Sequence, residues 1–88
     1  MLGGLNMEKQ IGKITHYYDR IGGAVLELEK GLKDGDTVHI AGPRTELVQR
    51  VISMEIDHKK VLAAGAGADV ALKVDGVVRE GDVIYRVT

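Results

Sequence analysis

One short phrase occurs twice in this chain of 88 residues, and each copy is followed by β-branched residues. The copies are Leu32-Lys33-Asp34-Gly35-Asp36 and Val78-Arg79-Glu80-Gly81-Asp82, which share an apolar residue, two charged residues and Gly-Asp. Glycine tolerates a positive φ, and the aspartate after it can hydrogen-bond the turn backbone. The residues that follow each copy alternate or are β-branched, as strands are. The phrase therefore predicts two turns that each open a strand, in a small all-β fold.

Composition limits the core and the charge. The length suits one domain with a modest core. The chain has three Tyr and neither Phe nor Trp, so we expect a core of Val, Ile, Leu and Ala. Twelve basic against thirteen acidic residues give a net charge of −1. A protein that binds nucleic acid through overall charge is basic, so any such binding here requires a local patch.

The chain has no cysteine, which excludes disulfides, thiolate catalysis and Cys-type zinc sites. For so small a domain this favours a reducing, cytoplasmic setting. No apolar run approaches the ~18–20 residues of a membrane span, and the N-terminus lacks the features of a signal peptide. We predict a flexible lead-in over residues 1–7, one domain over 8–88, and no association with a membrane.

Turn signals divide the chain into six predicted strands. In the first, Ile14, His16 and Tyr18 are expected to share a face, and in the fourth Val48, Ile52, Met54 and Ile56 are expected to share one. Residues 61–68 are expected to form a compact loop with room for one helical turn. Short strands without long helices favour a single six-stranded antiparallel β-barrel, which leaves no unpaired edges. The predicted strands are Gln10–Tyr18, Ala24–Glu29, Thr37–Ala41, Leu47–Asp57, Asp69–Val74 and Asp82–Val87.

The residue patterns give no indication of catalysis. The three histidines have neither close nor helical spacing, so no metal site is predicted. Ser53, the only serine, lies within a predicted strand and not at a nucleophile elbow. Gly65-Ala66-Gly67 lacks the third glycine of a dinucleotide fingerprint, and the chain has no P-loop. We therefore predict that the chain is not an enzyme and binds neither a cofactor nor a nucleotide.

Two local clusters combine cations with aromatic or imidazole rings. Lys13, His16 and Tyr17 lie beside Tyr18 and Arg20, so their rings could stack on bases while the cations meet phosphates. His58, Lys59 and Lys60, with Arg44 and Arg50, form the second cluster. The alternative for both is a solvated strand end, with tyrosine covering the mouth of the barrel.

The same residues carry a family resemblance. Ile11–Thr15, Gly31–Val38, Ser53–Ile56 and Val78–Asp82 resemble domain II of the translation GTPases, the β-barrel that follows the GTPase domain in elongation factor Tu. A closer resemblance joins Gly12–Tyr18, Ser53–His58 and Lys73–Asp82 to the barrel at the C-terminus of the collagenase-like peptidase family, some members of which are linked to tRNA hydroxylation. Both resemblances cover almost the whole chain, whereas the GTPase and peptidase-like domains are missing from it.

These resemblances imply a translation-factor domain II-like barrel and two alternative functions. The first is a non-catalytic module that binds RNA, namely tRNA or the ribosome, through Lys13, His16, Tyr17, Arg44, His58, Lys59 and Lys60. The alternative is a protein-interaction subunit that docks on a separately encoded peptidase-like or GTPase partner. A third possibility, an enzymatic or small-molecule-binding barrel, depends only on the His and Glu residues.

Overall fold

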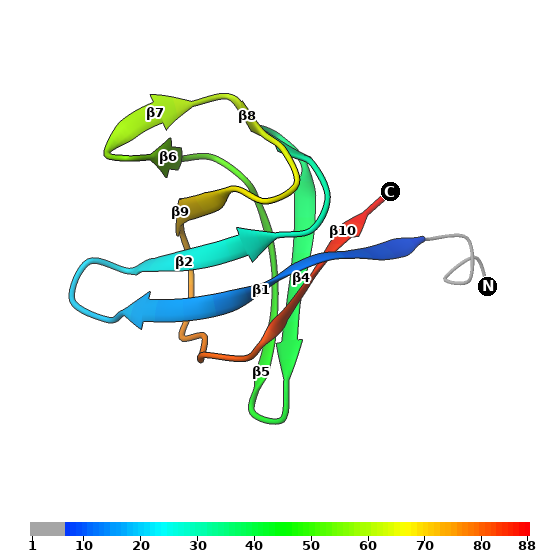
Figure 1. Ribbon diagram of the computed structural model, residues 1–88. Coiled ribbons are helices and arrows are strands. Elements are labelled where there is room, and N and C mark those ends of the chain that lie inside the picture. The colour runs from blue at the N-terminus through cyan, green and yellow to red at the C-terminus, as the bar shows by residue number, and fades with distance from the viewer. Residues whose placement is uncertain (1–6) are drawn as a thin grey trace.

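The computed structural model describes residues 7–88, and within them the chain is all-β with no helix (Figure 1). An eight-stranded antiparallel sheet has the order β5-β4-β10-β1-β2-β9-β6-β7, and β3 pairs with β8 in a second, small sheet. The predicted all-β class is confirmed. The strands are β1 (Glu8–Tyr18), β2 (Gly23–Leu28), β3 (Leu32–Lys33), β4 (Thr37–Gly42), β5 (Thr45–Arg50), β6 (Met54–Ile56), β7 (Lys59–Val61), β8 (Ala63–Ala64), β9 (Asp69–Lys73) and β10 (Val83–Val87).

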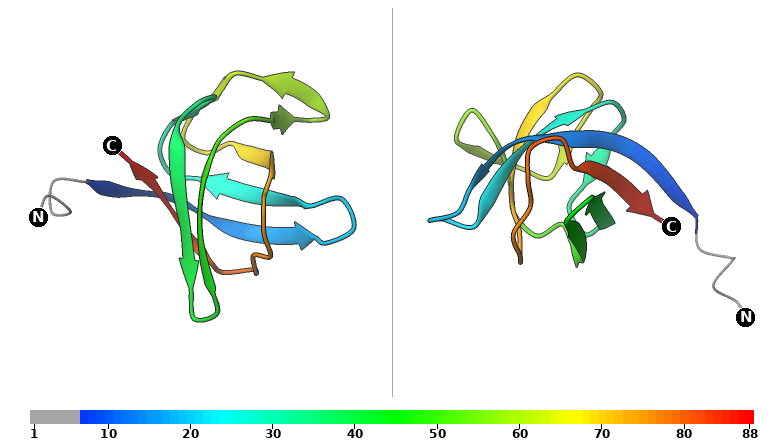
Figure 2. Two further views of the ribbon diagram at one scale, coloured as in Figure 1. Left: turned by 180° about the vertical axis from the view of Figure 1, so that it is seen from behind. Right: turned by 90° about the horizontal axis from the view of Figure 1, so that it is seen from below.

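Within residues 7–88, ten strands replace the six that were predicted. The long fourth strand divides into β5 and β6 because residues 51–53 leave the ladder. The predicted loop over 61–68 contains no helical turn; β8 within it pairs with β3, and β7 before it pairs with β6. The main sheet curls over itself (Figure 2), but its order ends at β5 and β7, so closure into a barrel stays a prediction.

The two repeated phrases form the predicted turns with the same geometry. Gly35 and Gly81 both have φ of 89°. The Asp36 carboxylate accepts a hydrogen bond from the Lys33 amide at 2.9 Å, and that of Asp82 accepts one from the Arg79 amide at 2.8 Å. Each aspartate thus pairs a turn amide that would otherwise lack a partner, as its position after glycine predicted.

The core is aliphatic, as the composition predicted. It lies inside the curled sheet, and none of its fully buried members is aromatic. Burial of these side chains is the main favourable term in folding a domain of this size. The buried apolar residues are Ile11, Ile14, Ala24, Leu26, Leu28, Leu32, Val38, Ile40, Val51, Met54, Val70, Leu72, Val74, Val78 and Ile84.

The predicted faces of the first strand are wrong after Ile14, because the strand contains a bulge. Pairing between β1 and β2 shifts by one residue between Ile14 and His16, so Ile14 is buried while His16 and Tyr18 are exposed. An extra residue in one strand reverses the side-chain parity after it. Tyr17 consequently faces inward, where it packs against the core half-buried. The bulge therefore places His16 and Tyr18 together on the outer surface.

The faces of β5 differ from the prediction, because a polar side chain is buried there and an apolar one is exposed. Val48 and the nearby Ile52 are 60% and 56% exposed, whereas Gln49 is buried. The Gln49 amide nitrogen donates to the Lys73 carbonyl at 2.9 Å, and its amide oxygen accepts from the Asp75 amide at 2.8 Å. Because its polar groups are paired with backbone, glutamine can occupy an inward position that the hydrophobic pattern assigns to valine.

One residue of the predicted lead-in, Met7, lies within the described part of the chain. Residues 1–6 lie outside the described part, but Met7 exchanges two backbone hydrogen bonds with Thr88, of 3.3 and 2.9 Å, and so extends the β1–β10 ladder. Across residues 7–88 the structure contains no helix long and apolar enough to cross a membrane.

Candidate protein-binding groove

The middle of the outer face of β2 and β9 carries small and apolar residues, whereas a solvent-facing sheet is usually polar. Val25 of β2 and Ala71 of β9 are register partners, and Glu55 of β6 is paired with Ala71 on the other side. Register partners in antiparallel strands project to the same face. An uncharged floor therefore runs across β2 and β9 and ends at the Glu55 carboxylate.

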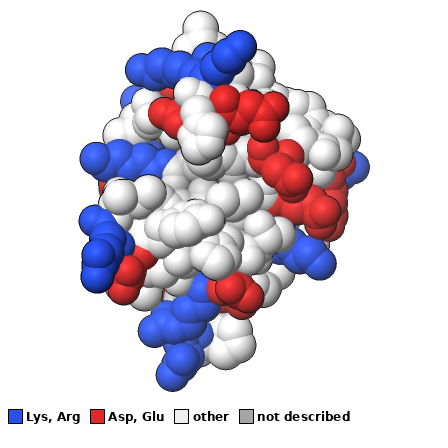
Figure 3. Space-filling view, turned by 60° about the vertical axis from the view of Figure 1, so that its left-hand side comes forward, with Lys and Arg blue, Asp and Glu red and all other residues white. Residues whose placement is uncertain are grey.

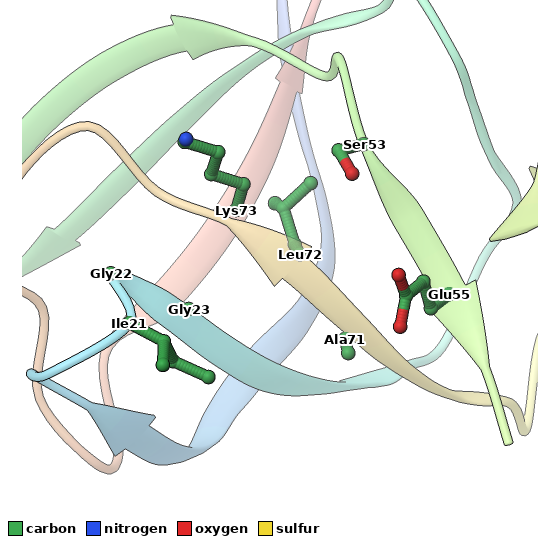
Figure 4. A pocket seen from close by; sticks show the side chains of 8 residues that line it. All are labelled: Ile21, Gly22, Gly23, Ser53, Glu55, Ala71, Leu72 and Lys73. Atoms are coloured by element: carbon green, nitrogen blue, oxygen red, sulfur yellow. The ribbon is translucent and has the colours of Figure 1, made fainter. Parts of the chain in front are cut away.

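Two adjoining hollows lie over this floor and form what we call the outer groove. Their volumes are about 430 and 170 Å³, and they share Ile21, Gly23, Glu55 and Ala71. In Figure 4, Glu55 projects from β6 towards β9, whereas Lys73 extends away from it. The remaining lining residues are Tyr18, Ala24, Val25 and His58 in the larger hollow and Gly22, Ser53, Leu72 and Lys73 in the smaller.

Exposed apolar side chains and a strained turn form the walls of the outer groove. Ile21 is 75% exposed and Tyr18 48% exposed. Asp57 and His58 form the two-residue connection between β6 and β7, with φ of 52° and 65°. Such turns favour Asn-Gly because both central residues need a positive φ. His58, which lines the larger hollow, is therefore held in a conformation that costs free energy.

Charged side chains of both signs border the outer groove. Glu55 makes no ion pair with any residue in 7–88, although Lys60 is its register partner on β7. In the view of Figure 3, an uncharged area is bordered by charges of both signs, with Lys and Arg predominating to its left and Asp and Glu to its upper right. The outer groove thus combines a small, apolar floor with Lys73 in its smaller hollow and a carboxylate that forms no ion pair within residues 7–88.

The structure places four of the predicted contact residues near the outer groove. His16 is the register partner of Val25, and its ring lies 4.4 Å from that of Tyr18, centroid to centroid. His58 lines the groove, and Lys59 and Lys60 follow it on the sheet-edge strand β7. Lys13 lies further along β1, opposite Glu27.

The other two predicted contacts lie elsewhere. Tyr17 faces the core on the opposite side of β1 from His16, because of the bulge. Arg44 lies in the β4–β5 turn, at the other end of the molecule from the β6–β7 turn (Figure 1), and its carbonyl accepts a hydrogen bond from Arg79 at 3.1 Å. The seven residues therefore do not form one continuous patch.

His39 lies on a different part of the outer face. Its ring nitrogens are 2.7 Å from Glu8 Oε1 and 2.6 Å from Glu46 Oε2, and its side chain is 16% exposed. The hydrogen bond to Glu8, and then the one to Glu46, raise the pKa of His39 above its ordinary 6.5, although partial burial opposes the rise. These paired groups tie β1, β4 and β5 together and offer no free donor set.

No cluster that could hold a metal ion is found among residues 7–88, when groups of at least three His, Cys, Asp or Glu side chains are considered. Ser53, a candidate nucleophile by residue type, lines the smaller hollow beside Glu55.

The sequence comparisons identify relatives that are much longer. No family model matches the chain. The chain is 42% identical over 77 residues to an uncharacterized protease of Methanocaldococcus jannaschii, which covers 86% of this chain and 19% of that protein. It is 33% identical over 86 residues to a collagenase of Porphyromonas gingivalis, which covers 96% of this chain and 24% of that protein. The chain is similar to one segment of such proteins.

Solved structures support the fold. The C-terminal domain of a Geobacillus thermoleovorans protein assigned to the U32 peptidases matches with a TM-score of 0.83, at 18% identity over 89% of this chain and 91% of that domain. Its selenomethionine variant gives a TM-score of 0.82 at 19% identity, over 86% and 96% of the two chains. The predicted resemblance to the C-terminal barrel of collagenase-like peptidases is confirmed at this level. The likeness to translation-factor domain II stays a prediction.

The comparisons correct one prediction. The sequence predicted that the chain is not an enzyme, but its relatives are named protease and collagenase, which connects it with peptidase-family enzymes. That prediction depends on the lack of a catalytic pattern within 88 residues. Since the chain spans about a fifth to a quarter of these relatives, that lack says nothing about an enzyme to which such a segment belongs.

Sequence reasoning did not identify Ile21, Val25 or Glu55 as candidates. One signal was present: Val25 is the exception in an otherwise alternating strand, Ala24 to Glu29. An apolar residue on a solvent-facing position is informative when its neighbours across the sheet are also uncharged. That condition depends on the pairing with Ala71, which only the structure provides.

Proposed function

We propose that this chain is a β-domain that docks through its outer groove on a peptidase-like catalytic domain and acts with it in one enzyme. The observation that carries this proposal is the sequence similarity to a segment of a protease more than four times as long. The groove adds support because its walls include the exposed Tyr18 and Ile21. Exposed apolar surface of this kind is typical of binding sites. The names of the relatives favour a peptidase-like partner over a GTPase.

The test uses the region of the Methanocaldococcus jannaschii protease outside the matched segment, with binding measured by calorimetry. We expect the chain to bind it, and Ile21→Asp to weaken binding at least tenfold. Val48→Asp is the matched control, because Val48 is also exposed but lies on β5, outside the groove. Surface changes of this kind usually alter stability by less than about 0.5 kcal/mol. Absence of binding, or equal losses in both variants, contradicts the proposal.

A second candidate function is binding of tRNA. It is supported by the resemblance to translation-factor domain II and by the adjacent rings of His16 and Tyr18, onto which a base could stack. Lys59 and Lys60 supply cations on β7. We further propose a cytoplasmic setting, which the lack of cysteine in so small a domain favours.

Titration of labelled tRNA at two salt concentrations tests this second function. Binding through phosphates weakens steeply with salt, and Lys59→Ala/Lys60→Ala should then lower both the affinity and the salt slope. Arg44→Ala, at the other end of the molecule, is the control. No binding at low salt contradicts the RNA function and leaves the docking function unaffected.

A further inference from the structure

The length of the outer groove suits an extended peptide. It runs alongside the three residues of β6, roughly 10 Å at about 3.3 Å per residue of strand, with Ser53 lining the smaller hollow and His58 of the β6–β7 turn lining the larger. This length accommodates about three extended residues. The larger hollow, of about 430 Å³, is large enough for an apolar side chain, and Tyr18, Ile21 and Val25 are among the residues that line it.

The single carboxylate in the larger hollow determines which side chains suit the groove. Glu55 lines both hollows, and no cation within residues 7–88 pairs with it. An apolar occupant would remove water from this carboxylate and leave it unpaired, which costs free energy. A phosphate would be repelled by it. A lysine or arginine on the occupant would instead form a charge-assisted hydrogen bond.

We infer that the outer groove binds an extended peptide segment that presents a lysine or arginine next to an apolar side chain. Glu55 binds the cation, and the apolar side chain lies against Tyr18, Ile21 and Val25. This inference rests on the proposed docking function, since the segment is expected on the peptidase-like partner. It specifies the chemistry of that segment.

The strained turn gives an independent expectation. His58 has φ of 65° and lines the larger hollow, so glycine would suit the backbone better but would remove one wall. His58→Gly should therefore raise the urea midpoint of unfolding and at the same time weaken peptide binding. A residue with a merely structural role in the turn would not show these opposite effects.

The experiment uses three acetylated and amidated peptides, Gly-Leu-Lys-Leu-Gly and its variants with Gln or Glu at the centre. Binding to the full chain is followed by NMR. We expect the Lys peptide to bind most tightly and to change the chemical shifts of the Ile21, Val25 and Ala71 amides. The Glu55→Gln substitution should lower the affinity for this peptide about 3- to 10-fold. Glu27→Gln is the matched control, on the same outer face but outside the hollows. Equal affinity for the three peptides, equal effects of both variants, or shifts confined to other surfaces would overturn the inference.

The two proposals can fail separately. If the protease region binds but Glu55→Gln leaves its affinity unchanged, the docking function stands and the peptide chemistry is wrong. If the Lys peptide binds selectively but the protease region does not bind, the peptide chemistry stands and the docking partner is wrong.

Discussion

The two Gly-Asp turns have the same hydrogen bonds but different surroundings. In the first, the Gly35 amide donates to the Val51 carbonyl, and the Val51 amide donates to that of Asp36, each at 2.8 Å. In the second, Gly81 and Asp82 exchange the equivalent bonds with Ile14, also at 2.8 Å. However, Asp82 is 2% exposed, whereas Asp36 is only half-buried. Local sequence therefore determines the turn, and its surroundings determine how much the turn contributes to stability.

The comparison extends to the strands that the turns open. His39 and Tyr85 each stand three residues after the turn aspartate, and they are register partners at the centre of the β4–β10 pair. On either side, β5 pairs with β4 and β1 with β10. This half of the sheet thus consists of two turn–strand units related by an approximate twofold axis, an arrangement that accounts for the repeated phrase.

The largest expected effect separates the two aspartates. Asp82→Ala leaves the Arg79 amide without its partner in a buried site, which should lower the free energy of unfolding by about 2–3 kcal/mol. Asp36→Ala exposes the Lys33 amide to water, so we expect a loss of about 1 kcal/mol. Urea denaturation of both variants measures the difference. Equal losses would mean that burial does not distinguish the turns.

Gly42→Ala tests why Asp82 is so well buried. A β-carbon on Gly42 would overlap the Asp82 carboxylate, so the aspartate must move or the strand must shift. Overpacking of this kind typically costs about 1–3 kcal/mol. Combined with Asp82→Ala, the same substitution should cost much less, because the overlapping atoms are gone. A penalty that stays the same in both backgrounds would place the strain elsewhere.

The glycines of the turns should behave alike. Gly35→Ala and Gly81→Ala each force an L-residue into φ near 89°, at a cost of about 1–2 kcal/mol. The space around them differs. A β-carbon at Gly35 would lie 3.6 Å from the Arg50 side chain, whereas a β-carbon at Gly81 would have no other atom of residues 7–88 within 4 Å. Equal decreases in the urea midpoints would show that backbone conformation, and not the space around the β-carbon, determines the loss of stability. A clearly larger loss at Gly35 would contradict this.

These turns also explain how far the sequence could predict the molecule. Turn chemistry depends on neighbouring residues, so both Gly-Asp turns, the strands after them and the aliphatic core could be predicted. The faces of β1 and β5 could not, because they depend on a bulge at Ile14–His16 and on backbone partners that make Gln49 a buried residue. The outer groove depends on three strands from distant parts of the chain. Only His58 of its lining residues was among the predicted contacts, and for a different function.

The smallest effect concerns the residue at which the two units differ most. At the centre of the pair one unit has His39, held between Glu8 and Glu46, and the other has Tyr85. Because these carboxylates raise the pKa of His39 in the folded state, its contribution is fully present below pH 6.5 and is lost as the pH rises through the raised value. The side chains of Glu8 and Glu46 are 41% and 76% exposed. We therefore expect their pairing with His39 to contribute only a few tenths to about 1 kcal/mol to the free energy of unfolding.

Urea midpoints measured from pH 5.5 to 9 should therefore fall more in the wild-type chain than in His39→Gln, which cannot gain the charge. His16→Gln is the control, because its ring lies 3.6 Å from a single exposed carboxylate, that of Glu80, and it should follow the wild-type profile. If His39→Gln and the wild-type chain lose the same stability over this range, the pairing of His39 with Glu8 and Glu46 does not stabilise the fold. The two units would then be held together by backbone pairing and core packing alone, as their matching turns already suggest for the rest of this half-sheet.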